Sequence, residues 1–529
     1  MKLAIARLAQ CLQGAGVWVA ACAVGVGLAN AASVPAASPI ARVRDNATPQ
    51  LVQLARDQEV SQAITLLDHG ADVNARAPDG TTALLWAIHY GETPLIDRLL
   101  RAHASVRLIN QFGASAMSEA AQFGDPGVIG KLLAAGADVE SPNADGQTAL
   151  MIIARTSNLA AAELLIRHGA NVNAREKWRG QTALHWAAAR SQAAMVKLLL
   201  RHGAHPNVRS YFDTFQRQVT AEPRVQARPT GGFTPLIYAA RQGCLECAQA
   251  LLGGGADANM TDPDGETPLL VATENFHFDL AAYLLRKGAN PNIWDFWGRT
   301  PLYAAVDLNT LPYGGRPDHI SLDATTSLKM IELLLDAGAN PNAQLKLFPP
   351  YRSLGADRGG DGMLTTGATA LLRAARAGDA AAIRLLLEHG ADPSLPNRFG
   401  ATPLMAAAGI GATSVDTRGK YKTQPEAVTT IELLLGKGAQ INAADYHGDT
   451  ALHGAASWGW NDVVRCLVSH HADLNAKDAR GMTPIDAAMG RAIVHGRGTP
   501  DVHQDTANLL RQLMVASNLT APQGPNRTL

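Results

Sequence analysis

Short apolar stretches recur along the chain in pairs, with a turn between the two members and polar residues after the second. Residues 182–188 begin with Thr, a good helix N-cap, and continue with mostly apolar side chains. The second stretch, 195–201, ends before Gly203, which can take the left-handed conformation at a helix end. Asn, Asp and Gly, as at 171–173 and 145–146, then turn the chain towards the next unit. The pattern predicts two short helices per unit and a hairpin that leads into the next.

This unit recurs along almost the whole chain. Most copies begin with Thr followed by Pro or Ala, and the spacing is 33 or 34 residues where nothing is inserted. Pro at a first helical position costs no hydrogen bond. No unit can bury its apolar faces alone, so neighbouring units must stabilise one another. The twelve predicted units begin at Thr48, Thr82, Ser115, Thr148, Thr182, Thr234, Thr267, Thr300, Thr369, Thr402, Thr450 and Thr483.

Two segments carry a family resemblance. TALHWAA at 182–188 with LLLRHGA at 198–204, and TALH at 450–453 with HADLNA at 471–476, resemble ankyrin repeats. The resemblance covers residues 48 to about 515. It implies an all-α fold, an ankyrin-repeat solenoid of about twelve helix-turn-helix units with β-hairpin fingers. It also implies a binding scaffold that has no shared catalytic residues.

The first thirty residues differ in character from the repeats. Lys2 and Arg7 precede an apolar run at 14–29, which is followed by a small-x-small cleavage site. The run is too short and too rich in glycine for a membrane span. We therefore expect export from a bacterial cell, with cleavage near Ala31 and a periplasmic or secreted mature protein. A lipid anchor at Cys22, after a lipobox-like stretch, is the alternative.

The remaining organisation follows from the repeat. We predict a signal peptide at 1–31, a linker at 32–46, the repeat domain at 47–516 and a disordered tail at 517–529. Inserts interrupt the period in two classes, which lie on opposite edges of an ankyrin-like stack and either carry function or represent tolerated loop growth. Fingers are lengthened at about 209–231 and 344–366, and the turns between paired helices at about 308–325, 410–426 and 491–503.

Composition and charge exclude several functions. The net charge is zero, no basic face is evident and we expect no nucleic-acid partner. Motifs for zinc proteases, serine hydrolases and phosphate loops are missing from the sequence, so we expect no catalysis, no cofactor and no metal. Many histidines stand near the ends of second helices, where an imidazole interacts favourably with free carbonyls. These histidines are His69, His103, His168, His202, His389, His470 and His471.

Aromatic residues are few, yet they concentrate in fingers, in inserts and at the ends of first helices. Exposed aromatic side chains often dominate the energetics of protein interfaces. We therefore predict a protein partner bound on the concave finger side, with the densest cluster at residues 293–299. The alternative is that these rings fold back as a satellite core. The predicted contact residues are Trp178, Tyr211, Phe212, Trp294, Phe296, Trp297, Arg299, Phe399, Tyr446 and Trp458.

A Cys-x-x-Cys pair, Cys244 and Cys247, lies at the start of a second helix. Two residues three positions apart lie on the same face of a helix. Cys244 and Cys247 could therefore be two buried thiols in the core or could form a disulfide, and export to an oxidising compartment would favour the disulfide. A redox accessory protein is the alternative function, since thiols at a helix N-terminus have lowered pKa values. A metal site would need further ligands, of which only His277 lies near by register. Cys466 is expected to be a buried thiol.

Overall fold

The structure, a computed structural model, describes residues 48–219, 226–310, 321–347, 363–411, 422–491 and 501–517. The predicted signal peptide, the alternative lipidation site at Cys22 and the linker lie outside the described residues, as does the tail after residue 517. The same is true of the central part of each predicted insert.

The described residues form twenty-four helices arranged in twelve pairs, so the predicted all-α solenoid of twelve units is confirmed. The pairs are α2 (Gln50–Arg56) with α3 (Val60–Asp68), α4 (Ala83–Tyr90) with α5 (Thr93–Arg101), α6 (Ala116–Phe123) with α7 (Pro126–Ala134), α8 (Ala149–Ile153) with α9 (Leu159–Arg167), α10 (Ala183–Ala189) with α11 (Ala193–Arg201), α12 (Pro235–Gln242) with α13 (Leu245–Gly253), α14 (Pro268–Glu274) with α15 (Phe278–Arg286), α16 (Pro301–Asn309) with α17 (Ser327–Asp336), α18 (Ala370–Ala377) with α19 (Ala380–Glu388), α20 (Pro403–Ala407) with α21 (Gln424–Leu435), α22 (Ala451–Ser457) with α23 (Asn461–Ser469), and α24 (Pro484–Ala488) with α25 (Gln504–Ala516).

Local chemistry explains where the helices begin and end. At the start of α16 the Thr300 Oγ1 atom accepts the N–H of Tyr303 at 3.1 Å, and Pro301 follows at the first helical position. After α15 the chain passes through Gly288 with φ of +87°, which only glycine adopts without strain. The repeated Thr-Pro pairs therefore mark the starts of helices, and the repeated glycines mark their ends.

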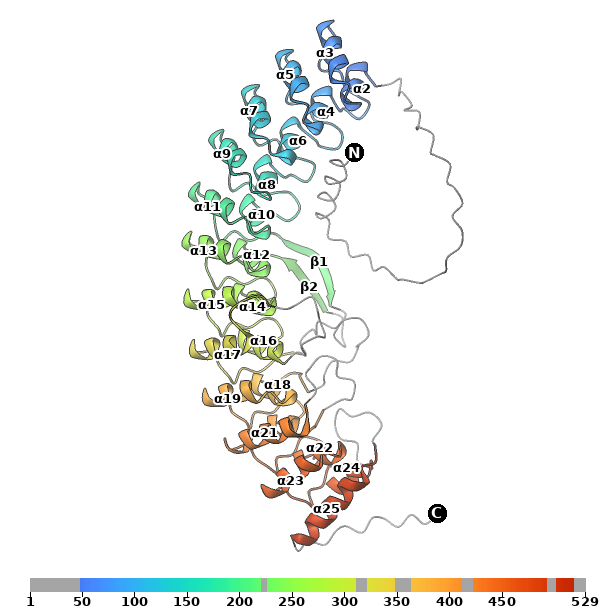
Figure 1. Cartoon of the computed structure of the whole chain (residues 1–529), viewed down its shortest axis with the longest axis vertical. Coiled ribbons are helices and arrows are strands. Elements are labelled where there is room, and N and C mark those ends of the chain that lie inside the picture. Colours follow the sequence, from blue (N-terminus) through green and yellow to red (C-terminus); the bar gives the residue numbers. More distant parts are fainter. Residues whose placement is uncertain are drawn as a thin grey trace, which may run out of the picture. The chain divides into compact units, whose positions relative to one another are not determined.

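Successive pairs stack in chain order (Figure 1). First helices pack on neighbouring first helices, as α10 does on α12, and second helices on neighbouring second helices, as α11 does on α13. The buried side chains between them are mainly Ala, Leu, Ile and Val, for example Leu184, Ala187 and Ala239. Small side chains let the short helices approach closely, which accounts for a composition poor in aromatic residues.

A ladder of asparagine side chains joins consecutive units after their second helices. Asn292 Nδ2 donates to the carbonyl oxygen of Gly338 at 2.9 Å, and its Oδ1 accepts the N–H of Asn340 at 2.7 Å. One side chain thus satisfies a donor and an acceptor of the next unit. The ladder is interrupted at Ser394, whose side chain bonds within its own unit. The same pair of bonds is made by Asn173, Asn207, Asn259, Asn342 and Asn442.

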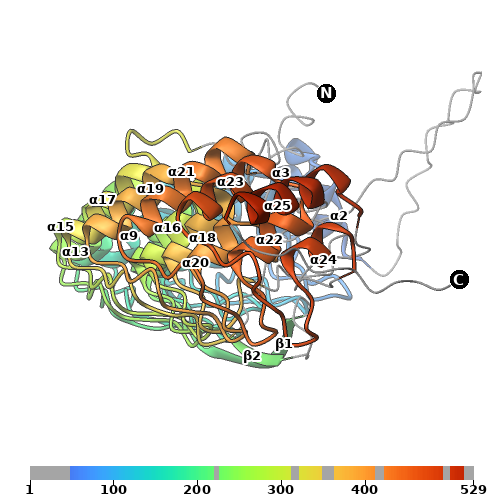
Figure 2. The ribbon, with the colours of Figure 1, turned by 90° about the horizontal axis from the view of Figure 1, so that it is seen from below.

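The hairpin fingers leave the helix layer on one side, as the view along the stack shows (Figure 2). The insert after the fifth unit forms two antiparallel strands, β1 (Phe212–Val219) and β2 (Gln226–Gly231). In four other fingers a single β-bridge closes the hairpin, as between Arg76 and Thr82. The remaining described fingers are tight turns without strands.

Candidate partner-binding surface

Seven of the fingers are held by a polar side chain at the base. In the finger after α15, the Oδ1 atom of Asp295 accepts the N–H groups of Trp297 at 3.0 Å and Arg299 at 2.7 Å. A short Asp or Asn side chain stabilises such a turn when its oxygen accepts backbone N–H groups of the residues that follow it. Equivalent pairs of bonds are made by Asn110, Asn143, Asp262, Asn397, Asp445 and Asp478.

Neighbouring fingers are also joined through their backbones. The N–H of Phe296 donates to the carbonyl oxygen of Asp264 at 2.6 Å, and the N–H of Tyr446 donates to that of Phe399 at 2.9 Å. Gly298 lies at such a junction and has φ of +84°. A Cβ atom added there would come within 2.5 Å of the backbone nitrogen of Lys346. The fingers therefore form a continuous edge whose tip side chains are presented in fixed positions.

Several of the predicted contact residues are exposed on this edge. Arg175 lies over the Tyr211 ring with 4.5 Å from its guanidinium carbon to the ring centroid, and Lys177 Nζ lies 5.0 Å from that of Trp178. Such cation–π contacts orient a ring without removing it from solvent. We call these exposed residues, together with Phe112 in the finger before α6, the finger aromatics. Their exposed fractions are 65% for Phe112, 65% for Trp178, 47% for Tyr211, 57% for Phe212, 55% for Trp294 and 76% for Tyr446.

The prediction that Trp297 is an exposed anchor is wrong. Trp297 is only 5% exposed, and its ring makes an edge contact with Phe296 at 5.5 Å between centroids. The carbonyl oxygen of Trp297 also accepts the N–H of Lys346 in the next finger at 2.8 Å. Within residues 293–299, the satellite-core interpretation therefore holds for Trp297, whereas Trp294 remains exposed.

Three further predicted residues are partly withdrawn from the surface. Phe296 and Phe399 are half-buried. Trp458 is half-buried too, because its Nε1–H donates to the carbonyl oxygen of Gly409 at 3.0 Å and its ring lies 5.9 Å from that of Trp460. These rings can offer an edge to a partner but are already packed against their own stack.

Arg299 has a structural partnership that the sequence analysis missed. Its guanidinium contacts Asp295 at 2.6 Å, Glu274 at 2.6 Å and Glu266 at 3.4 Å. Burial would lower the pKa of Arg299, but the charges of Glu274 and Asp295 together raise it above its ordinary value. For the carboxyl groups burial has the opposite effect: it raises the pKa of Asp295 and, more strongly, that of Glu266. Arg299 is therefore the positive centre of a buried cluster and is withdrawn from the contact set.

The same carboxylates have the chemistry of a cation site. Ligand atoms of Glu266, Glu274 and Asp295 lie within 4.8 Å of one another. Arg299, however, already contacts all three and supplies the positive charge that they require. The arrangement fits a charge cluster that fixes the base of a finger, and we assign no metal to it.

The prediction that histidines interact with free carbonyl groups at the ends of second helices is confirmed for three of them. The Nδ1 atoms of His69, His168 and His389 each lie 2.7 to 2.9 Å from the carbonyl oxygen four residues earlier. Two other histidines are buried and connect units. His185 Nε2 lies 3.1 Å from the Phe233 carbonyl oxygen, and His453 makes the equivalent contact with the next unit.

A disulfide joins Cys244 and Cys247 in the structure. Both residues are buried, and the Cys244 Sγ accepts the N–H of Cys247 at 3.2 Å at the start of α13. This burial gives no support to a redox function, because an exchange reaction needs access to a sulfur. Cys466 is half-buried, not fully buried as expected, and burial raises the pKa of its thiol.

The structure also reveals a local basic surface, although the sequence analysis found none. Neutral overall charge concealed it, because its residues come from three units. We define the basic face as four arginines around the rings of Trp186 and Tyr238. These arginines are Arg155, Arg179, Arg190 and Arg241.

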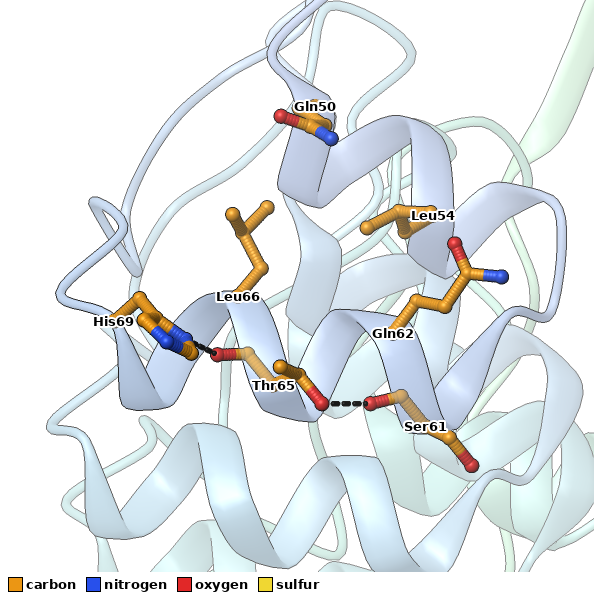
Figure 3. Close-up of a pocket in the computed structure, with 7 residues that line it drawn as sticks. All are labelled: Gln50, Leu54, Ser61, Gln62, Thr65, Leu66 and His69. Atoms are coloured by element: carbon orange, nitrogen blue, oxygen red, sulfur yellow. Dashed lines mark hydrogen bonds between the residues drawn. The ribbon is translucent and has the colours of Figure 1, made fainter.

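A small hollow lies on the first helix pair (Figure 3). It measures about 310 Å³ and lies between α2 and α3, with Leu54 and Leu66 pointing into it. Thr65 Oγ1 donates to the Ser61 carbonyl oxygen at 2.9 Å, and the Thr65 carbonyl oxygen bonds to His69. Thr65 and His69 are thus engaged within or at the end of α3, and the seven residues that line the hollow include no carboxylate that could form an acid and base pair with His69.

Stacked helix pairs with a finger edge define a repeat scaffold, and the comparison with known families agrees. The model for ankyrin repeats, in three copies, matches residues 51–143, 117–210, 236–345, 319–415 and 423–510. These matches cover most of the chain. The chain belongs to the ankyrin-repeat family.

Individual relatives share only parts of their length with this chain. It is 31% identical over 197 residues to the B-cell lymphoma 3 protein homolog of Mus musculus, a match covering 34% of this chain and 40% of that protein. It is 34% identical over 142 residues to the cyclin-dependent kinase 4 inhibitor B of Bos taurus, covering 27% and 88%. A match to human SH3 and multiple ankyrin repeat domains protein 2 is 27% identical and covers 33% and 10%. The chain thus spans less than half of the first of these relatives.

Among the described residues, no helix has the length and apolar character needed to cross a membrane. The described helices are at most 13 residues long, whereas a membrane span takes about 20.

Proposed function

We propose that this protein is a non-catalytic scaffold of the cell envelope that binds a partner protein through its finger edge. Membership of the ankyrin-repeat family supports an interaction role. The observation that carries the proposal is the row of finger aromatics, six large rings exposed on tips that backbone hydrogen bonds hold in place. Rings presented rigidly lose little conformational entropy on binding, so they suit interface hot spots.

The contact residues retained from the sequence are those that remain accessible. Trp178, Tyr211, Phe212, Trp294 and Tyr446 form the main surface, and Phe112 extends it towards the first units. Phe296, Phe399 and Trp458 contribute ring edges at most. Trp297 and Arg299 support the surface from beneath.

Photo-crosslinking from single positions tests this proposal. A photoreactive residue would replace Trp178, Trp294 or Tyr446 in the full chain, and Glu388, exposed at the end of α19, as the matched control. We expect one partner protein to be captured from the three finger positions and not from Glu388. Equal capture from Glu388, or capture from that position alone, would place the interface elsewhere and contradict the proposal.

Export is the second part of the proposal, and it rests on the charged start and apolar run of residues 1–31. Cell fractionation with N-terminal sequencing of the mature protein tests it. We expect a periplasmic or secreted protein that begins near residue 32. A lipid-modified Cys22 would support the anchored alternative, and a cytosolic protein that retains Lys2 would contradict export.

A further inference from the structure

At two joints between units, charged or titratable side chains of neighbouring first helices pair in the same register. The residue seven positions after the unit's first Thr faces the residue four positions after the next unit's first Thr or Ser. His89 meets Glu119 in this way at 3.3 Å, and Asp307 meets Arg373 at 2.5 Å. Each such contact joins groups of opposite or potentially opposite charge, so little charge is left for a partner.

The joint between the fourth and fifth units has a different contact in this register. At the equivalent positions, Arg155 lies over the ring of Trp186, with 5.4 Å between the guanidinium carbon and the centroid. A ring attracts a cation but does not neutralise it. Arg190, at the end of α10, is close enough to Arg155 to oppose its charge, an effect second to burial in lowering the Arg155 pKa. Within the part of the chain that the structure describes, two guanidinium groups therefore share this site without an ion pair to a carboxylate.

The sixth unit continues the same surface. The hydroxyl oxygen of Tyr238 accepts a hydrogen bond from Gln181 Nε2 at 2.5 Å. Arg179 and Arg241 both act on this hydroxyl electrostatically, although burial dominates and raises its pKa. Among the residues that the structure describes, neither arginine forms an ion pair with a carboxylate. Glu176 is nearby, but its carboxylate is buried and accepts the N–H groups of Trp178 and Arg179.

Acidic fingers border the basic face on both sides. Asp145 lies in the finger before it, and Asp264 lies in the finger after the sixth unit. In that second finger Asp262 is buried and Glu266 is paired with Arg299, so the bordering charges are those of Asp145 and Asp264. A long polyanion would have to run on into these negative charges. A short anionic segment with apolar side chains matches the four arginines and two rings better, because it can end before the acidic fingers.

We propose that the basic face binds a short acidic segment of the partner protein. Carboxylates of that segment bind Arg155, Arg179, Arg190 and Arg241, and an apolar side chain packs on Trp186 and Tyr238. Arginine suits this role because its planar group binds a carboxylate in a bidentate manner and also stacks on rings. The inference names the kind of partner for the scaffold and so rests on the proposed function.

Fluorescence anisotropy with the full mature chain tests it. The probes are a labelled decapeptide of glutamates with one Leu and one Tyr, its all-glutamine counterpart, and a single-stranded oligothymidylate of similar length. We expect the glutamate peptide to bind best and to weaken as the salt rises towards about 150 mM. The double variant Arg155→Gln with Arg190→Gln should weaken its binding about tenfold.

The matched control is the double variant Arg167→Gln with Arg201→Gln, which removes two arginines from the outer helices of the same two units. We expect its affinity for the peptide to match that of the wild type, with thermal unfolding showing both double variants folded. No binding of the glutamate peptide, equal weakening in the control, or tighter binding of the oligothymidylate would overturn the inference. If crosslinking from the finger aromatics still captures a partner in that case, the scaffold function stands and only the acidic segment is lost.

Discussion

The Nε2 atom of His185 lies 3.1 Å from the carbonyl oxygen of Phe233, although 48 positions and the whole β1–β2 hairpin separate the two residues. The Nδ1 atom of His185 accepts the N–H of Thr182 at 3.0 Å, so Nε2 carries the proton and donates it to Phe233. His453 repeats the arrangement with Met482 at 3.2 Å. The insert therefore leaves the joint between two units intact.

Replacing His185 by Ala should destabilise the stack at this joint. The change leaves the Phe233 carbonyl without its donor and creates a small cavity, at a cost of about 2 to 4 kcal/mol. Urea unfolding followed by circular dichroism would measure the loss. His205→Ala, at an exposed position, is the control, and an equal loss there would mean that the unit joint has no special role.

His185 should also make the stack sensitive to acid. Burial lowers its pKa to about 4, against about 6.5 in an unfolded chain. Between these pH values His185 is protonated in the unfolded chain but neutral in the folded one, so the free energy of unfolding falls as the pH falls from 6.5 towards 4. The loss is about 3 kcal/mol when complete. His185→Gln should show a shallower decline of urea midpoints over this range, and an unchanged decline would contradict the assignment.

Asp262 should make the stack less stable as the pH rises, the opposite of the effect of His185. Burial raises its pKa to about 6, above the ordinary value of 3.8. Its stabilising contribution is therefore fully present below pH 3.8 and is lost as the pH rises through 6. Asp262→Asn keeps the acceptor for the N–H groups of Asp264 and Glu266 while removing the charge. We expect this variant to be more stable than the wild type at pH 7 and equal to it near pH 3.5, in paired urea titrations.

The asparagine ladder should contribute measurably to the coupling between units. Asn292→Ala removes one donor and one acceptor used by the next unit, for a loss of about 1 to 3 kcal/mol. Ser394→Ala, at the equivalent position where the ladder is interrupted, should change stability by less than about 0.5 kcal/mol. Amide hydrogen exchange would locate the effect, with faster exchange expected in the units on either side of Asn292.

The disulfide should be inaccessible and modestly stabilising. Native protein is expected to leave Cys244 and Cys247 unlabelled by a thiol reagent, while denatured and reduced protein labels both. Because the sulfurs close a loop with a sequence separation of only 3, replacing both residues by Ala should cost about 2 kcal/mol. Rapid labelling of the folded protein would show instead that these thiols are reduced and exposed.

Much of the fold could be predicted because every unit repeats the same local signals. Thr before Pro or Ala starts a helix, and Gly after an apolar stretch ends one, whatever the neighbouring units contain. The finger aromatics could be predicted partly for the same reason, since the repeat register places Trp178 and Trp294 near the finger tips. Register alone could not distinguish Trp294 from Trp297, because their exposure depends on how the next finger packs.

The sequence by itself determined the twelve helix pairs, their order and the edge from which the fingers project, since these depend on short-range patterns repeated in register. Only the tertiary structure decided which charges are left without partners. Arg299 and Arg155 look alike in the sequence, yet one is surrounded by three carboxylates and the other lies on a tryptophan ring. The physical reason is that each side chain meets residues of the adjoining unit, 25 to 33 positions away, where the stacking of the units fixes the contact.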